Sequence, residues 1–102
     1  MPSDKGYLDY ILEQLGGAEG ITFRKMMGEY LLYADGRLFG GIYDNRLLVK
    51  PVPAARRMMP EAPEEMPYPG AKPMLLVEQV DDRGFLAALI AAMYDELPPA
   101  KH

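Results

Sequence analysis

The side chains that could carry out catalysis are few in this sequence. Ser3 is the only serine, Thr22 is the only threonine, and His102, the last residue, is the only histidine. The chain contains no cysteine, which excludes a disulfide, a thiolate nucleophile and a cysteine metal site. A catalytic unit of nucleophile, base and orienting group therefore has no suitable members, and zinc or iron binding is not expected.

Carboxylates remain as candidates for acid–base chemistry. They occur in three adjacent pairs, Glu64-Glu65, Asp81-Asp82 and Asp95-Glu96. A catalytic pair of carboxyl groups needs burial or mutual repulsion that shifts its two pKa values apart. Adjacent acids in loops or at helix ends are far more often solvated, or they cap a helix. We therefore predict that the chain is not an enzyme and holds neither a cofactor nor a metal.

Two amphipathic helices are predicted near the ends of the chain. Residues 4–15 and 82–97 each contain apolar side chains at offsets 0, 1, 4, 5 and 8, which form one stripe on a helix. Ser3 can cap the first helix, and Gly16-Gly17 ends it. Asp81 or Asp82 caps the second helix.

Residues 22–50 predict a four-strand antiparallel meander. Three two-residue turn candidates, Gly28-Glu29, Asp35-Gly36 and Asp44-Asn45, separate short apolar-rich runs. The strands are expected at residues 22–27, 30–34, 37–43 and 46–50. A proline-rich excursion with seven prolines follows at residues 51–73, and residues 74–80 are expected to form a fifth strand.

This order of elements predicts an α+β fold. We expect residues 1–102 to form a single domain, because a chain of this length suits one core. Its architecture is a two-layer sandwich, with a mainly antiparallel sheet of about five strands and the N- and C-terminal helices on one face. The N-terminus shows no apolar signal region, and no run approaches 18 apolar residues, so we expect a cytoplasmic protein without membrane contact.

The predicted turns set a register, which divides the strand residues between two faces. The face expected to meet the helices consists of Arg24, Met26, Leu31, Tyr33, Leu38, Gly40, Ile42, Leu47 and Val49. The face expected to stay open combines four cations with four aromatic rings. Its candidate binding residues are Lys25, Tyr30, Arg37, Phe39, Tyr43, Arg46 and Lys50, accompanied by Phe23, Met27, Leu32 and Leu48. Gly28 and Gly36 are expected to be structural turn residues.

Three interpretations of this open face remain. A basic, aromatic sheet face can stack bases and hold phosphates. Long cationic side chains can instead cover apolar strands while their charges stay hydrated. The apolar members can also form a dimer or partner interface. Residues 24–57 hold seven cations and three acids, but the net charge of the whole chain is −4, which argues against tight non-specific nucleic-acid binding.

The stretch RKMMGEYLLYADGRLFGGIYDNRLLVK, residues 24–50, resembles the N-terminal domain of the TfoX/Sxy competence-regulator family. The shared pattern is Arg-Lys-Met, one residue, Gly, one residue and Tyr, followed by a glycine turn, Phe39, Ile42, Leu47 and Lys50. This pattern is matched in the present sequence by Arg24, Lys25, Gly28, Tyr30, Gly36, Phe39 and Lys50. The resemblance extends over about residues 5–97. It implies a two-layer α+β domain without catalytic residues.

Full-length relatives in that family are implicated in switching on DNA-uptake genes alongside a transcription activator. They carry a further C-terminal helical domain, which these 102 residues do not contain. The resemblance therefore implies a regulatory or adaptor role through protein–protein contacts, and a homodimer is one form that such contacts can take. The alternative function is weak contact with nucleic acid through the basic, aromatic face.

Overall fold

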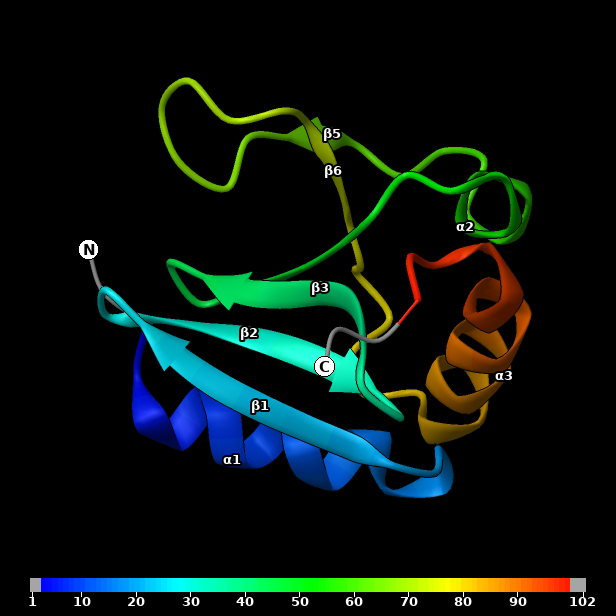
Figure 1. Cartoon of the computed structure of the whole chain (residues 1–102), viewed down its shortest axis with the longest axis horizontal. Helices are drawn as coiled ribbons and strands as arrows, with labels where there is room; N and C mark the ends of the chain where they lie inside the picture. The colour runs from blue at the N-terminus through cyan, green and yellow to red at the C-terminus, as the bar shows by residue number, and fades with distance from the viewer. Residues whose placement is uncertain (1–2, 100–102) are drawn as a thin grey trace.

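A single antiparallel sheet organises the chain, and helices cover one of its faces (Figure 1). The computed structural model describes residues 3–99. The strands, in their spatial order, are β1 (Ile21–Met26), β2 (Glu29–Ala34), β3 (Arg37–Tyr43), β4 (Arg46–Val49), β6 (Met74–Leu76) and β5 (Glu64–Glu65). The α+β fold and the antiparallel meander are confirmed. The sheet has six strands rather than about five, because the proline-rich excursion adds β5 at its edge.

Three helices accompany the sheet, and aspartates cap the two long ones. The helices are α1 (Lys5–Gln14), α2 (Pro53–Met58) and α3 (Arg83–Met93), and the short 3₁₀ turns η1 (Leu15–Gly17) and η2 (Tyr94–Glu96) extend α1 and α3. Asp4, and not Ser3, caps α1 by accepting a hydrogen bond from the Gly6 N–H at 2.9 Å. Asp82 caps α3 in the same way. None of the helices within residues 3–99 has the length and apolar character that crossing a membrane needs.

The core lies between the helices and one face of the sheet, which we call the helix face. Leu8 and Ile11 of α1 and Leu86, Leu89 and Met93 of α3 are all buried in it. Their partners from the sheet and the segment after it are Tyr30, Leu32, Ala34, Phe39, Ile42, Leu47, Val49, Leu75 and Val77. Removal of this apolar surface from water is the main force that holds the two layers together.

Three two-residue turns connect the first four strands. Their central residues all have positive φ: 53° and 84° at Met27-Gly28, 52° and 83° at Asp35-Gly36, and 53° and 56° at Asp44-Asn45. Positive φ at both central positions is typical of type I′ hairpins. The first turn is therefore Met27-Gly28, one residue earlier than predicted, and Met26 pairs with Glu29.

A β-bulge in β3 decides which side chains face the helices. Tyr33 pairs with Leu38, but Leu32 pairs with Gly40, so that Phe39 is an extra residue in β3. One extra residue reverses the alternation of the faces beyond it. Phe39 and Ile42 therefore both reach the helix face, although an unbroken strand would point them to opposite faces, and both are fully buried.

The predicted assignment of faces is consequently wrong for β1, β2 and the start of β3. Three residues expected on the open face are buried against the helices: Tyr30, Leu32 and Phe39. Five residues expected against the helices lie on the opposite face, which we call the second face: Arg24, Met26, Leu31, Tyr33 and Leu38. The prediction is right for the residues that follow the bulge, Ile42, Leu47 and Val49.

Residues 51–73 fold back onto both sides of the sheet. Helix α2 packs Ala54 and Ala55 into the core, and the Ala54 N–H donates a hydrogen bond to the Glu96 carboxylate at 2.7 Å. Further along, Pro67 is buried, and the ring centroid of Tyr68 lies 6.5 Å from that of Tyr43. The excursion therefore covers the part of the second face around Tyr43.

Gly40→Ala tests the bulge. A Cβ at Gly40 would lie 2.1 Å from the Leu48 carbonyl oxygen and 2.9 Å from the Val49 Cα, so the backbone would have to shift. We expect the free energy of unfolding, measured in urea, to fall by about 2–3 kcal/mol. Gly84→Ala in α3 is the matched control, because its nearest neighbouring atom is 3.7 Å away; it should gain about 0.5–1 kcal/mol. Equal stability of the two variants would contradict the bulge geometry.

Candidate functional site

The seven predicted binding residues do not share one face of the sheet. Tyr30 and Phe39 belong to the buried core on the helix face. Arg37 also points to that side, where its Nη1 donates hydrogen bonds to the carbonyl oxygens of Tyr94 at 3.2 Å and Leu97 at 3.5 Å. Its guanidinium carbon lies 4.4 Å from the centroid of the Tyr94 ring. These three residues hold the fold together and are not available to a partner.

The other four predicted residues are divided between the faces. Tyr43, Arg46 and Lys50 are on the second face, but Arg46 pairs with the Glu65 carboxylate and donates from Nε to the Tyr43 carbonyl oxygen at 3.1 Å. Lys25 lies opposite Tyr30 in the ladder and therefore belongs to the helix-face side of the exposed edge. The prediction that cations and rings gather on one open face is wrong, because the bulge separates them.

Several residues of the first hairpin are exposed to solvent. Phe23 and Met26 keep 47% and 46% of their surface exposed, and Met27, at the tip, keeps 95%. Arg24 and Lys25 are exposed beside them and form no ion pair within residues 3–99. The strand pattern predicted Met26 as a core residue and did not identify Met27 as a turn residue. The signal for the turn was the Met-Gly pair itself, since Gly fits its second position.

Glu29 anchors the base of this hairpin. Its carboxylate accepts hydrogen bonds from the Ser3 N–H at 2.9 Å and the Ser3 hydroxyl at 2.5 Å, and the Asp44 N–H donates to both of its oxygens. The Ser3 hydroxyl oxygen in turn accepts from the Asn45 N–H at 3.1 Å, and the Asp4 N–H donates to the Asn45 side chain at 2.8 Å. The first hairpin, the third hairpin and the start of α1 are thus tied together.

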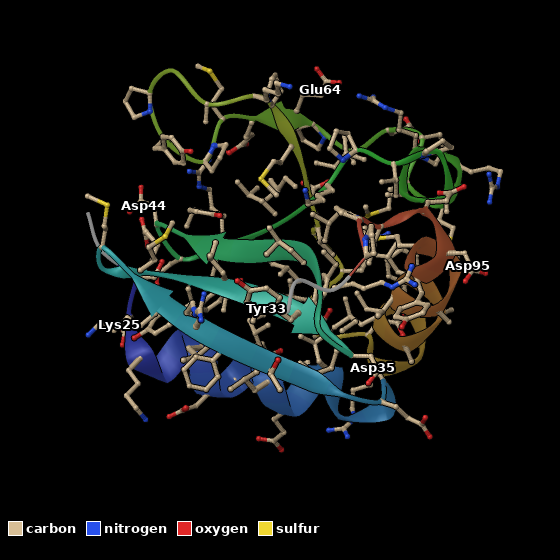
Figure 2. All side chains as sticks on the ribbon, viewed as in Figure 1. Lys25, Tyr33, Asp35, Asp44, Glu64 and Asp95 are labelled. Atoms are coloured by element: carbon tan, nitrogen blue, oxygen red, sulfur yellow. The ribbon has the colours of Figure 1, made fainter. Side chains whose placement is uncertain are left out.

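This network forms at one end of the sheet. Figure 2 shows Lys25 and Asp44 at the end where the first and third hairpins turn, and Asp35 at the opposite end. Because Glu29 directly follows the turn, the network holds the base of the hairpin while Met27 projects beyond it. The tip is therefore presented on a fixed support.

The edge of β1 is a second exposed feature. The Gly20 carbonyl accepts a hydrogen bond from the Asp35 N–H at 2.8 Å. Bonded and non-bonded pairs alternate along an antiparallel ladder, so Thr22, Arg24 and Met26 make the bonds to β2. The backbone N–H and C=O groups of Ile21, Phe23 and Lys25 consequently point away from the sheet.

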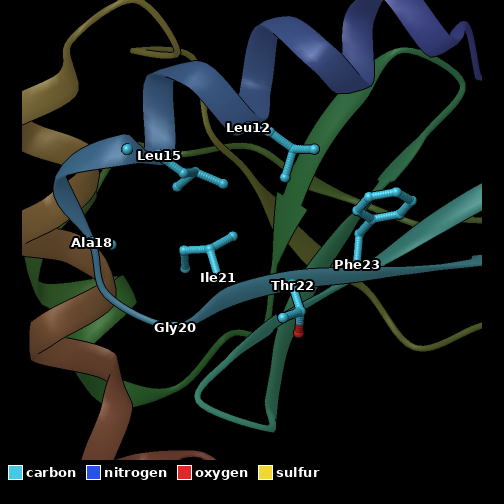
Figure 3. A pocket seen from close by; sticks show the side chains of 8 residues that line it. Leu12, Leu15, Ala18, Gly20, Ile21, Thr22 and Phe23 are labelled. Atoms are coloured by element: carbon cyan, nitrogen blue, oxygen red, sulfur yellow. The ribbon is translucent and has the colours of Figure 1, made fainter.

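An apolar gap runs beside this edge, between β1 and the end of α1. Figure 3 shows Leu12 and Leu15 from the helical side and Ile21 and Phe23 from β1 around it. A separate groove lies on the second face and is lined by Thr22, Arg24, Leu31, Tyr33, Leu38 and Lys50 together with Pro98 and Pro99. No group of three or more metal-binding side chains occurs within residues 3–99, and His102 lies outside the described residues.

Most of this chain is similar to known protein sequences. A family model described as the TfoX N-terminal domain matches residues 13–96, from the last two residues of α1 to the end of η2. An uncharacterized 12.7 kDa protein in the trpE 5′ region of Spirochaeta aurantia is 35% identical over 80 residues. The aligned residues cover 78% of this chain and 70% of that protein. No solved structure matches the chain significantly.

Glu29→Ala tests the anchor of the hairpin. The substitution leaves the Ser3 and Asp44 N–H groups without their acceptor, so we expect the free energy of unfolding in urea to fall by about 1–3 kcal/mol. Glu13→Ala, on the exposed side of α1, is the matched control and should change stability by no more than about 0.5 kcal/mol. If the two variants are equally stable, the network does not support the fold.

Ionisation of Tyr43 is expected to lower the free energy of unfolding at alkaline pH. Burial raises the pKa of its phenol above the ordinary value of 10.0, and the neighbouring Tyr68, Glu29 and Tyr33 add to this effect. The unfolded chain therefore releases this proton first, so the stability is fully present below about pH 10 and declines as pH rises further. We expect Tyr43→Phe to lose less stability than the wild type between pH 9 and pH 11, measured by urea unfolding. Parallel decline of the two proteins would contradict this assignment.

Proposed function

Because the chain belongs to the TfoX N-terminal domain family, a family of non-enzymatic, competence-regulator-type domains, we propose that it works by binding a protein partner through the tip of its first hairpin. The contact surface consists of Met26 and Met27, with Arg24 beside them. The coarse role, a regulatory-type domain, follows from the family. The contact itself is our proposal, and it rests mainly on Met27.

Met27 is a poor choice for the stability of the fold. It has a φ of 53°, and only glycine, asparagine and aspartate adopt positive φ with ease. Its side chain is 95% exposed, so it buries almost no apolar surface within the domain. A residue that costs stability and gains no packing is what we expect at a functional position. The other two turns have aspartate in the corresponding place, Asp35 and Asp44.

The chemistry of the tip favours a protein over nucleic acid. Methionine is flexible and polarizable and adapts to apolar partner surfaces, and methionine, arginine and aromatic residues are enriched in protein interfaces. The cations that a nucleic acid would need are dispersed, since Arg37 and Arg46 are engaged within the fold. The tip and the support provided by Glu29 therefore suit a small, preorganised protein contact.

Met27→Asn separates binding from folding. Asparagine-glycine is the preferred type I′ pair, so the variant should be more stable in urea by about 0.5–1 kcal/mol. It also removes the apolar tip, so we expect partner capture from nuclease-treated native lysate to fall at least about tenfold, the effect of losing roughly 1.4 kcal/mol of contact.

Met66→Asn is the matched control. Met66 is 53% exposed, but it directly follows β5, which forms the opposite edge of the sheet from β1. The control should capture the same proteins as the wild type. Equal capture by Met27→Asn and the wild type would reject the tip as the contact, and capture that disappears with nuclease treatment would indicate a nucleic-acid partner instead.

A further inference from the structure

The exposed edge of the sheet points to a second copy of this chain as its occupant: we infer that two copies pair β1 with β1, antiparallel, about a two-fold axis at Phe23. The pairing would join two six-stranded sheets into one continuous sheet. This inference goes beyond the proposed function, because it concerns the strand edge and self-association rather than the hairpin tip and another protein.

The edge of β1 is available along its length. Five of the six residues in β1 are exposed, and the strand contains neither a proline nor a bulge that would prevent pairing. Outward-pointing N–H and C=O groups at Ile21, Phe23 and Lys25 form the regular template that another strand needs. Within β1, the side chains that would oppose pairing with another strand are the cations Arg24 and Lys25. Their positions therefore decide which pairings are permitted.

The outward groups and the charges together select one register. In an antiparallel pair, outward-pointing residues must face outward-pointing residues, which allows two-fold axes at Thr22, Phe23, Arg24 or Lys25. An axis at Arg24 or Lys25 sets that cation directly opposite its own copy, which is destabilising. An axis at Thr22 pairs only residues 21–23, because β1 begins at Ile21. An axis at Phe23 pairs residues 21–25 of both copies and sets no cation directly opposite a cation, since the two copies of Arg24 meet only diagonally.

Charge complementarity supports the same register. With the axis at Phe23, Lys25 lies opposite Ile21 of the other copy and close to its Glu19, which stands two residues before Ile21 in the bend that leads into β1. Glu19 is exposed and forms no ion pair with another residue of the described chain. The two-fold axis creates this Lys25–Glu19 contact twice. Phe23, which is 47% exposed, would pack beside its own copy at the centre.

Charge reversal tests the pairing in solution. We expect wild-type protein to show a concentration-dependent monomer–dimer equilibrium in sedimentation velocity, detectable below about 1 mM. Lys25→Glu and Glu19→Lys should each weaken dimerisation at least about tenfold, because each sets like charges together. The double variant Glu19→Lys/Lys25→Glu should restore the wild-type equilibrium, since the contact is reversed but intact.

Cysteine crosslinking reads the register directly, because the chain contains no cysteine. Thr22 and Arg24 of the two copies would face each other in non-bonded pairs, with Cα atoms about 4.5 Å apart. Thr22→Cys/Arg24→Cys should therefore form a covalent dimer on mild oxidation. Thr22→Cys alone is the matched control and should not, because its two copies would lie diagonally at about 7–8 Å.

The outcomes separate this inference from the proposed function. A protein that stays monomeric up to about 1 mM, or that crosslinks equally through Thr22→Cys alone, overturns the pairing. Met27→Asn should leave the dimer unchanged, since the two tips lie at opposite ends of the paired strands. A monomer that still loses its partner on Met27→Asn would refute only the pairing, whereas a dimer whose partner capture ignores Met27→Asn would refute only the proposed function.

Discussion

The extra residue in β3 is the constraint on which the two faces of this sheet depend. With Phe39 inserted between the pairs Tyr33–Leu38 and Leu32–Gly40, the strand supplies both Phe39 and Ile42 to the same core. The insertion is possible because Gly40 follows, where any Cβ would collide with the β4 backbone. Helices α1 and α3 pack on the helix face that results. The bulge therefore also determines which side chains lie on the second face.

Local patterns predicted the elements of this fold well, since they depend on neighbouring residues. The apolar stripe of Leu8 and Ile11 and the Asp-Gly turn at Asp35-Gly36 are examples. Faces are different, because each depends on a count along the whole strand. One bulge adds a residue to the strand and so reverses the face of every residue on its other side. The alternation of apolar and polar residues did not indicate that a bulge was present. The adjacent glycines Gly40 and Gly41, inside a strand pattern, were the sequence feature that could have indicated a bulge.

The candidate site could be predicted only in part for the same reason. Lys25 was expected on the open face but lies on the helix-face side of the exposed edge, and Tyr30 and Phe39 were assigned to that open surface when they are core residues. The hairpin tip was missed because Gly-first turns are also common, so Gly28-Glu29 and Met27-Gly28 were both compatible with the pattern. Glu29 could not be recognised as an anchor, since its partners Ser3 and Asp44 are distant in the chain. Only the assembled fold separates Gly28, Glu29 and Tyr30, which support the hairpin, from the methionines that it displays.

The opposite edge of the sheet bears on how far self-association can proceed. β5 contains two residues, Glu64 and Glu65, whose carboxylates are engaged by Arg56 and Arg46. So short and charged an edge offers too little backbone to recruit another strand. Pairing through β1 is isologous and uses up the remaining edge of both copies. Assembly by strand addition would therefore stop at two chains and could not propagate into a fibre, even at high concentration.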